Sequence, residues 1–107
     1  MSVSTHVLDA AKGVPAAGVP ITLTDADGVV LTSSATDSDG RAKDLLPEDA
    51  DPGVYRLTFD TGHWFDSVGV VGFYPEVTIS FTIVDPTIHH HVPLLLSPFA
   101  FSTYRGS

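Results

Sequence analysis

EVTISFTIV (residues 76–84) carries the clearest sign of β-structure in the chain. Its apolar side chains occupy every second position, at Val77, Ile79, Phe81 and Ile83, and threonine or serine fills the positions between them. Successive side chains of a β-strand point to opposite faces of the sheet. The period of two therefore predicts a strand with one buried face.

The same alternation recurs along the chain. GVYRLTFD (53–60) places Tyr55, Leu57 and Phe59 on one face, and SVSTHVL (2–8) alternates in the same way. In VPITLTDADGVV (19–30), Asp27-Gly28 separates two alternating runs and supplies the turn residues of a hairpin.

Helix is expected in one place only, between Asp60 and Tyr74, with Thr61 as the N-cap and Gly69 at the end. The chain as a whole contains eight prolines and nine glycines, so long helices are unlikely. We therefore predict an all-β fold, a β-sandwich of seven to eight strands with one short helix, in a single domain over residues 1–107.

Composition limits the classes of function. The chain has no cysteine, which excludes a disulfide scaffold and thiolate metal sites. Thirteen acidic residues against five basic ones give a net charge of −8, so no nucleic acid and no anionic membrane is expected as a partner. MSVSTHVLDAAKG (1–13) does not resemble a signal peptide, and the apolar run 92–96 is too short to cross a bilayer, so a cytoplasmic location is expected.

The last nineteen residues, HHHVPLLLSPFAFSTYRGS (89–107), predict a hairpin of strands 88–96 and 99–105 around Ser97-Pro98. Alternation puts His89 and His91 on one face of the first strand and His90 on the other. Leu95 joins the His91 side, so this strand is apolar on both faces. A strand of that kind is covered on both faces, which in a chain this small indicates a second subunit.

Each polar candidate also has a structural interpretation. His89 and His91 could share a metal ion, but such a site needs three or four ligands and no carboxylate follows at a matching offset, so no metal is expected. By default His6 is structural, Arg41 is a solvated loop charge and Arg105 is mobile. Brought together, these histidines and arginines would form a hydrolytic site, because histidine activates water and arginine stabilises an oxyanion. Spacing alone does not show that they meet.

Four stretches carry a resemblance to a known family: STHVLDAAKGVPAAGVPITL (4–23), SDGRAKDLL (38–46), FYPEVTISF (73–81) and the closing nineteen residues. Together they resemble the transthyretin-related family, whose hydrolase members act on 5-hydroxyisourate. The terminal Tyr-Arg-Gly-Ser is the most specific element, since transthyretins proper do not keep it.

The resemblance implies a transthyretin-like (prealbumin-like) sandwich that assembles as a homotetramer, with active sites at the dimer-dimer interface and no cofactor. Carried over residue by residue, it implies that His6, Arg41 and His91 are catalytic. It also implies that four residues bind the substrate, namely Tyr104, Arg105, Gly106 and Ser107. His90 replaces the tyrosine common in the family, but it lies on the face opposite His91.

The implied reaction is hydrolysis of 5-hydroxyisourate to 2-oxo-4-hydroxy-4-carboxy-5-ureidoimidazoline in urate degradation. His6 and His91 would form the acid/base pair, and Arg41 would bind the substrate and stabilise the oxyanion. Two alternatives stay open: a transthyretin-like carrier of a small ligand without catalysis, and an adhesion or assembly module in which residues 104–107 are dispensable.

Overall fold

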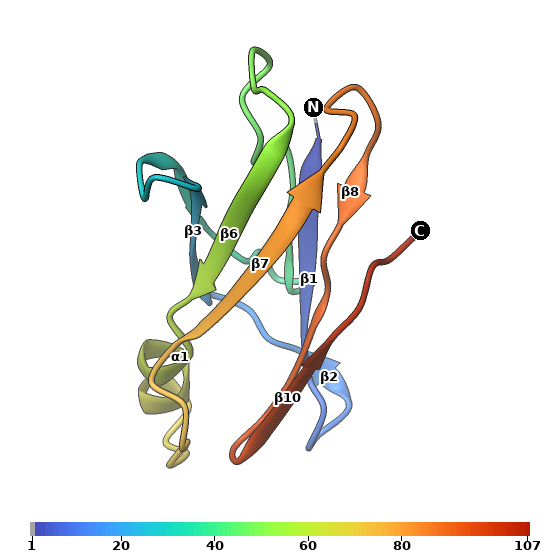
Figure 1. Ribbon diagram of the computed structural model, residues 1–107. Coiled ribbons are helices and arrows are strands. Elements are labelled where there is room, and N and C mark those ends of the chain that lie inside the picture. Colours follow the sequence, from blue (N-terminus) through green and yellow to red (C-terminus); the bar gives the residue numbers. More distant parts are fainter. Residues whose placement is uncertain (1) are drawn as a thin grey trace.

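The computed structural model describes residues 2–107, which form two β-sheets packed face to face (Figure 1). The six-stranded sheet contains β1 (Val3–Asp9), β2 (Val14–Pro15), β5 (Arg41–Ala42), β8 (His90–His91), β9 (Leu94–Ser97) and β10 (Ala100–Thr103). The four-stranded sheet contains β3 (Pro20–Asp25), β4 (Val30–Ala35), β6 (Gly53–Phe59) and β7 (Val77–Ile83). One short helix, α1 (Thr61–Ser67), follows β6.

The predicted all-β sandwich is confirmed. Over the described residues there are ten strands rather than seven or eight, because β2, β5 and β8 are two-residue segments. The alternating stretches 19–30, 53–60 and 76–84 form strands, as predicted, and these belong to the four-stranded sheet. In it β4 pairs antiparallel with β3, β3 with β6, and β6 with β7. No helix in this part of the chain has the length and apolarity needed to cross a bilayer.

β1 lies at the centre of the six-stranded sheet, as the blue strand in Figure 1 shows. It pairs in parallel with β8 and β9 on one side and antiparallel with β2 and β5 on the other. Residues far apart in the sequence are therefore placed side by side along β1, and this arrangement builds the site described below.

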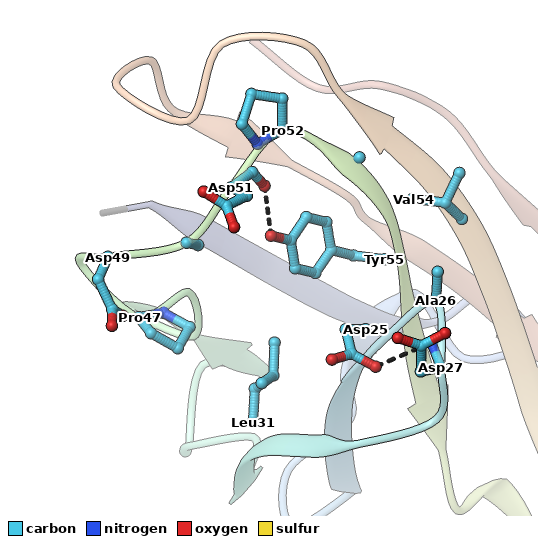
Figure 2. Close-up of a pocket in the computed structure, with 12 residues that line it drawn as sticks. Asp25, Ala26, Asp27, Leu31, Pro47, Asp49, Asp51, Pro52, Val54 and Tyr55 are labelled. Carbon is cyan, nitrogen blue, oxygen red and sulfur yellow. Dashed lines mark hydrogen bonds between the residues drawn. The ribbon is translucent and has the colours of Figure 1, made fainter.

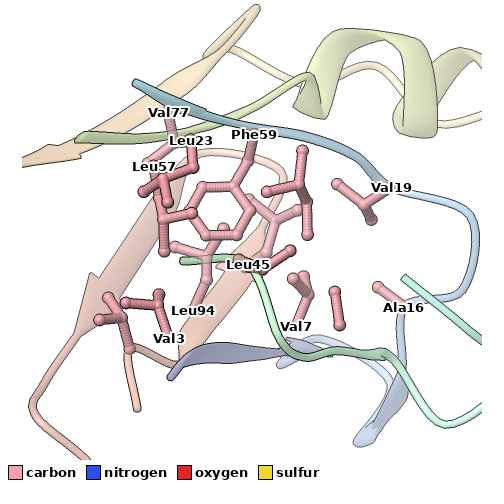
Figure 3. Packing of buried hydrophobic residues seen from close by; sticks show 14 of the residues in the cluster. Val3, Val7, Ala16, Val19, Leu23, Leu45, Leu57, Phe59, Val77 and Leu94 are labelled. Carbon is pink, nitrogen blue, oxygen red and sulfur yellow. The ribbon is translucent and has the colours of Figure 1, made fainter. Parts of the chain in front are cut away.

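The core lies between the two sheets (Figure 3). Val3, Val7 and Leu94 enter it from the six-stranded sheet and Leu57 and Phe59 from the four-stranded sheet, and all five side chains are fully buried. Burying an apolar side chain of this size stabilises the fold by about 1.5–3 kcal/mol. These buried residues fix which side chains of β1 point away from the core.

The helix confirms the predicted segment but corrects its first residue. Asp60, not Thr61, is the N-cap: its side chain accepts a hydrogen bond from the backbone N–H of His63 at 3.2 Å. Thr61 is buried as the first helical residue, and its hydroxyl donates to the carbonyl of Tyr74 at 2.7 Å. The helix ends before Gly69, whose φ of 71° is the left-handed conformation common after a helix.

The predicted terminal hairpin is present but shorter. β9 and β10 pair antiparallel from Ser97↔Ala100 to Thr103↔Leu94. The first arm, predicted as one strand over 88–96, is divided into β8 and β9, and Pro93 lies between them, where it has no N–H to offer a ladder. The second arm, predicted over 99–105, is β10 alone.

Candidate active site

β1 presents Ser4 and His6 on the face of the six-stranded sheet that points away from the core, called the outer face below. The intervening residues Val3, Thr5 and Val7 are buried toward the core, so the alternating positions point outward. β5 sets Arg41 directly opposite His6, and β8 sets His91 opposite Ser4. The pairing thus brings His6, Arg41 and His91 onto one face, which the sequence alone could not show.

His6 is oriented by a turn carbonyl. Its Nε2 lies 2.9 Å from the carbonyl oxygen of Asp39. A carbonyl only accepts hydrogen bonds, so Nε2 carries the proton and donates it. In the neutral ring, Nδ1 is then the nitrogen with a free lone pair.

Arg41 lies in a short strand, β5, rather than in the loop that is its default location. The Asp37 side chain accepts hydrogen bonds from the backbone N–H groups of Asp39 at 2.9 Å and Arg41 at 3.0 Å. The bond from the Arg41 N–H is the main cause that lowers the pKa of Asp37. Gly40 completes this turn at a φ of 75°, and a Cβ there would lie 2.4 Å from the Val7 carbonyl oxygen. Only glycine fits, so the position of Arg41 is closely fixed.

His91 is held from behind by Ser4. The Ser4 Oγ lies 2.7 Å from His91 Nδ1. Partial burial is the largest cause that lowers the pKa of His91 below 6.5, followed by electrostatic repulsion from Arg41 and, after it, from the His89 and His6 side chains. His91 is therefore neutral near pH 7, the protonation state of a general base.

Ser4 is a functional candidate that the sequence interpretation missed, and His89 was considered there only as a possible metal ligand. Ser4 Oγ also lies 2.9 Å from His89 Nε2, and Ser2 Oγ lies 2.8 Å from His89 Nδ1. The rings of His89 and His91 are nearly parallel, with centroids 6.3 Å apart and an angle of 18° between planes. Alternation already placed Ser4 on the same face as His6, and that was the available signal. Among residues 2–107, no group of three or more His, Cys, Asp or Glu side chains is placed to hold a metal ion.

His90 points the other way, as predicted. It is buried, with 6% exposure, and its Nδ1 donates to the Ile88 carbonyl at 2.9 Å. It takes no part in the outer face.

Gly106 reaches His91 directly. Its backbone N–H donates to the His91 carbonyl at 2.8 Å, and the two residues form an isolated antiparallel bridge. A Cβ at position 106 would lie 2.4 Å from the Cδ2 atom of the His91 ring. The tail (residues 104–107) therefore passes against the imidazole at a position where only glycine fits.

The other tail residues take different positions. Tyr104 and Arg105 line a hollow of about 320 Å³ with His90, His91 and Phe81, and neither His6 nor Arg41 lines it. Ser107 is exposed. Of the four predicted substrate-binding residues, Gly106 thus packs on the His91 ring, and Tyr104 and Arg105 line a hollow that His91 also lines.

A second hollow of about 320 Å³ lies at another part of the surface (Figure 2). Its wall includes four carboxylates, Asp25, Asp27, Asp49 and Asp51, and the Tyr55 hydroxyl donates to the Asp51 carbonyl. Burial and then the nearby Asp51 and Asp25 charges raise the pKa of Tyr55. This acidic wall is unsuited to an anionic ligand, in contrast to the outer face with its arginine and histidines.

Comparison with known proteins decides the family. The family model described as HIUase/Transthyretin family matches residues 3–106. The chain belongs to the HIUase/Transthyretin family. Within this family, the chain is 46% identical to the 5-hydroxyisourate hydrolase of Salmonella dublin over 108 residues, covering 97% of this chain and 79% of that protein.

Solved structures of this family have the same fold. The Klebsiella pneumoniae 5-hydroxyisourate hydrolase superposes with a TM-score of 0.91 at 37% identity, covering 99% of this chain and 98% of that one. Sea bream transthyretin in complex with thyroxine superposes with a TM-score of 0.89 at 31% identity, covering 97% and 93%. The HIUase/Transthyretin fold thus includes both an enzyme and a thyroxine-binding protein, and the residues of the site must distinguish them.

Proposed function

We propose that this chain is a hydrolase that opens the lactam ring of 5-hydroxyisourate during urate degradation. Its Salmonella and Klebsiella relatives carry the name 5-hydroxyisourate hydrolase. The observation that carries the proposal is the convergence of His6, Arg41 and His91 on the outer face through the pairing of β1 with β5 and β8. The relationship to the Salmonella and Klebsiella hydrolases supports the same conclusion.

His91 is the residue best suited to activate water. Its lowered pKa keeps it neutral, and its Nδ1 is engaged by Ser4, so Nε2 remains for the attacking water. Arg41 supplies a fixed positive charge beside it, which binds the anionic substrate and stabilises the oxyanion. His6, whose Nε2 is bound to the Asp39 carbonyl, orients the water or the leaving group through Nδ1.

The proton balance of the reaction fits one general base and direct attack by water. His91 accepts a proton from water as the new C–O bond forms, and it returns this proton to the ring nitrogen when the lactam C–N bond breaks. The carboxylic acid then ionises and releases the second proton to solvent. Ser4, the serine bonded to His91, is buried and also bonded to His89, so it is not free to attack. We therefore favour water over an acyl-enzyme.

We propose that the tail closes this site and that the site lies at the dimer-dimer interface of a homotetramer. Three observations support an assembly: Arg41 is exposed, His6 and His91 are only half-buried, and Leu8 and Leu95 pair on the outer face while half-exposed. A second copy over this face would exclude water from the site and strengthen its electrostatic interactions. Tyr104, Arg105, Gly106 and Ser107 are then proposed to contact the substrate.

A carrier function is the second candidate, because sea bream transthyretin shares the fold. A carrier of an aromatic ligand needs an apolar and uncharged channel. Two half-buried histidines and an arginine on the outer face argue against it.

The test is the rate at which 5-hydroxyisourate, formed in place from urate and urate oxidase, loses its ultraviolet absorbance. We expect His91→Asn and Arg41→Ala to reduce turnover at least ~100-fold, the loss typical of a general base or an oxyanion donor. His63→Asn in α1 and Arg56→Ala in β6 are matched controls away from the outer face and should keep the wild-type rate. Wild-type rates in folded His91 and Arg41 variants would refute these assignments.

A further inference from the structure

A continuous chain of hydrogen bonds lies behind His91. It runs from Ser2 Oγ to His89 Nδ1 at 2.8 Å, from His89 Nε2 to Ser4 Oγ at 2.9 Å, and from Ser4 Oγ to His91 Nδ1 at 2.7 Å. Ser4 is buried, with 8% exposure, so its hydroxyl is largely shielded from bulk water. Among the linked residues His89 is exposed to solvent, and the series of hydrogen bonds ends at His91, the proposed base.

Counting protons restricts how this chain can be arranged. A serine hydroxyl has one hydrogen, and a neutral imidazole has one N–H. If His89 carries its proton on Nδ1 and donates it to Ser2, its bare Nε2 must accept the Ser4 hydroxyl. Ser4 then has no hydrogen left for His91, so His91 must donate Nδ1–H to Ser4.

The arrangement determines whether His91 can act as a base. With its proton on Nδ1, His91 has a lone pair on Nε2, and residues 2–107 offer Nε2 no hydrogen-bond partner that would occupy it. If His89 carried its proton on Nε2 instead, the Ser4 hydroxyl would be free to donate to His91 Nδ1. The proton of His91 would then lie on Nε2, and this nitrogen could not accept a proton from water.

We propose that Ser4 and His89 are positioning residues that hold His91 in its Nδ1–H tautomer, with Nε2 free for the attacking water. This inference rests on the proposed hydrolase function and adds two residues to it. Ser4 and His89 do not touch the substrate, and they act only through the ring of His91.

The strand pairing makes this role specific to Ser4. β1 and β8 pair in parallel with Ser4 opposite His91, so the hydroxyl is fixed beside the ring. When His91 gains a proton, its Nδ1–H becomes a charge-assisted donor and the bond to Ser4 strengthens. A buried carboxylate does this in the serine hydrolases. Here a neutral serine-histidine pair takes its place, and burial together with the nearby Arg41 charge lowers the pKa of His91.

The direct test is the ¹⁵N NMR spectrum of the imidazoles at pH 8, above the ordinary histidine pKa of about 6.5. Histidine rings are neutral at that pH, and Arg41 is the remaining charge facing His91. In the wild-type protein we expect the His91 signals of the Nδ1–H tautomer. In Ser4→Ala and in His89→Phe, which keeps a flat ring but has no nitrogen, we expect a shift toward Nε2–H.

Kinetics supply the second readout. Loss of an outer hydrogen-bond partner commonly costs about 10–100-fold in activity, and we expect this loss in kcat for Ser4→Ala and His89→Phe. KM should change by less than about threefold, because substrate contacts are retained. Ser4→Thr retains the hydroxyl and should restore both tautomer and kcat. Ser4 is buried, so Ser4→Ala could lower activity by disturbing the fold. His89 is exposed, so His89→Phe tests the same series of hydrogen bonds with less risk to folding.

Two results would overturn the inference: His91 in its Nε2–H tautomer in the wild-type protein, or an unchanged tautomer in both variants. The NMR measurement needs no substrate, so it is independent of the hydrolase proposal. A wild-type protein with the Nδ1–H tautomer but no effect on 5-hydroxyisourate would remove the proposed function and leave the positioning of His91 established.

Discussion

Replacing Gly106 by alanine tests whether the tail and His91 form one site. The new Cβ would lie 2.4 Å from His91 Cδ2, 3.1 Å from Cγ and 3.3 Å from Cβ, whereas ordinary contact begins near 3.4 Å. Either the imidazole or the tail must move by about 1 Å to remove the clash. Moving the tail also strains the 2.8 Å hydrogen bond from the Gly106 N–H to the His91 carbonyl.

A displacement of this size should change the rate of catalysis strongly and the stability of the fold only slightly. Misplacing a reacting group by about 1 Å can cost about 100-fold in rate, which corresponds to about 2.7 kcal/mol in the activation barrier. The tail contributes little to the core, since Tyr104, Arg105 and Ser107 are exposed. We therefore expect Gly106→Ala to lower kcat about 100-fold, with the midpoint of thermal unfolding nearly unchanged.

Gly28→Ala is the matched control. Gly28 lies in the β3-β4 turn with a φ of 85°, and a Cβ added there would have no atom within 4 Å. The left-handed conformation costs alanine roughly 1–2 kcal/mol, so this variant should be less stable but fully active. Wild-type kcat in Gly106→Ala, measured by the decay of 5-hydroxyisourate, would refute the contact between tail and base.

Further predictions concern three single residues, His91, Asp37 and Phe59. The lowered pKa of His91, due first to burial and then to Arg41, predicts that kcat/KM falls on the acid side with a midpoint below 6.5 and reaches a plateau at higher pH; a midpoint above 6.5 would contradict it. The same lowered pKa means that the contribution of His91 to stability is complete above 6.5 and declines as the pH falls through the folded-state value. Asp37→Ala removes the side chain that accepts the hydrogen bond from the Arg41 N–H, so kcat should fall. Because the pKa of Asp37 is lowered in the folded protein, wild-type stability should decline below pH 3.8 more than the stability of the variant, which acid titration followed by circular dichroism would show. Phe59→Ala opens a cavity at the centre of the core and should cost about 3–5 kcal/mol in the free energy of unfolding, measured with urea.

The sheets could be predicted from the sequence because their signal is local. Val77 and Ile83 in β7 and Tyr55 and Leu57 in β6 follow the period of two, and their burial agrees with it. The boundaries were less accurate, because they depend on tertiary contacts. Asp60 is the N-cap because its side chain accepts a hydrogen bond from the N–H of His63. The neighbouring Thr61 is an equally suitable N-cap residue by type, so the sequence did not distinguish the two positions.

The site could be predicted only in part. His6, Arg41 and His91 were named through the family resemblance, but their meeting depends on the pairing of β1 with β5 and β8, which periodicity does not specify. Ser4 was missed because a serine in a strand carries no distinctive pattern, and His89 was considered only as a metal ligand beside His91. Their role appears only when parallel pairing sets Ser4 beside both rings.

The proposed hydrolase converts 5-hydroxyisourate with repeated turnover, whereas a carrier would bind it without converting it. The most direct measurement adds the protein at about one hundredth of the concentration of 5-hydroxyisourate and follows the ultraviolet decay to completion. We expect decay faster than the spontaneous rate, in proportion to the amount of protein, with many equivalents of substrate consumed per chain. This acceleration should be lost in His91→Asn. Decay at the spontaneous rate from the folded protein, with ligand bound at no more than one equivalent per chain, would contradict the hydrolase proposal and favour the carrier.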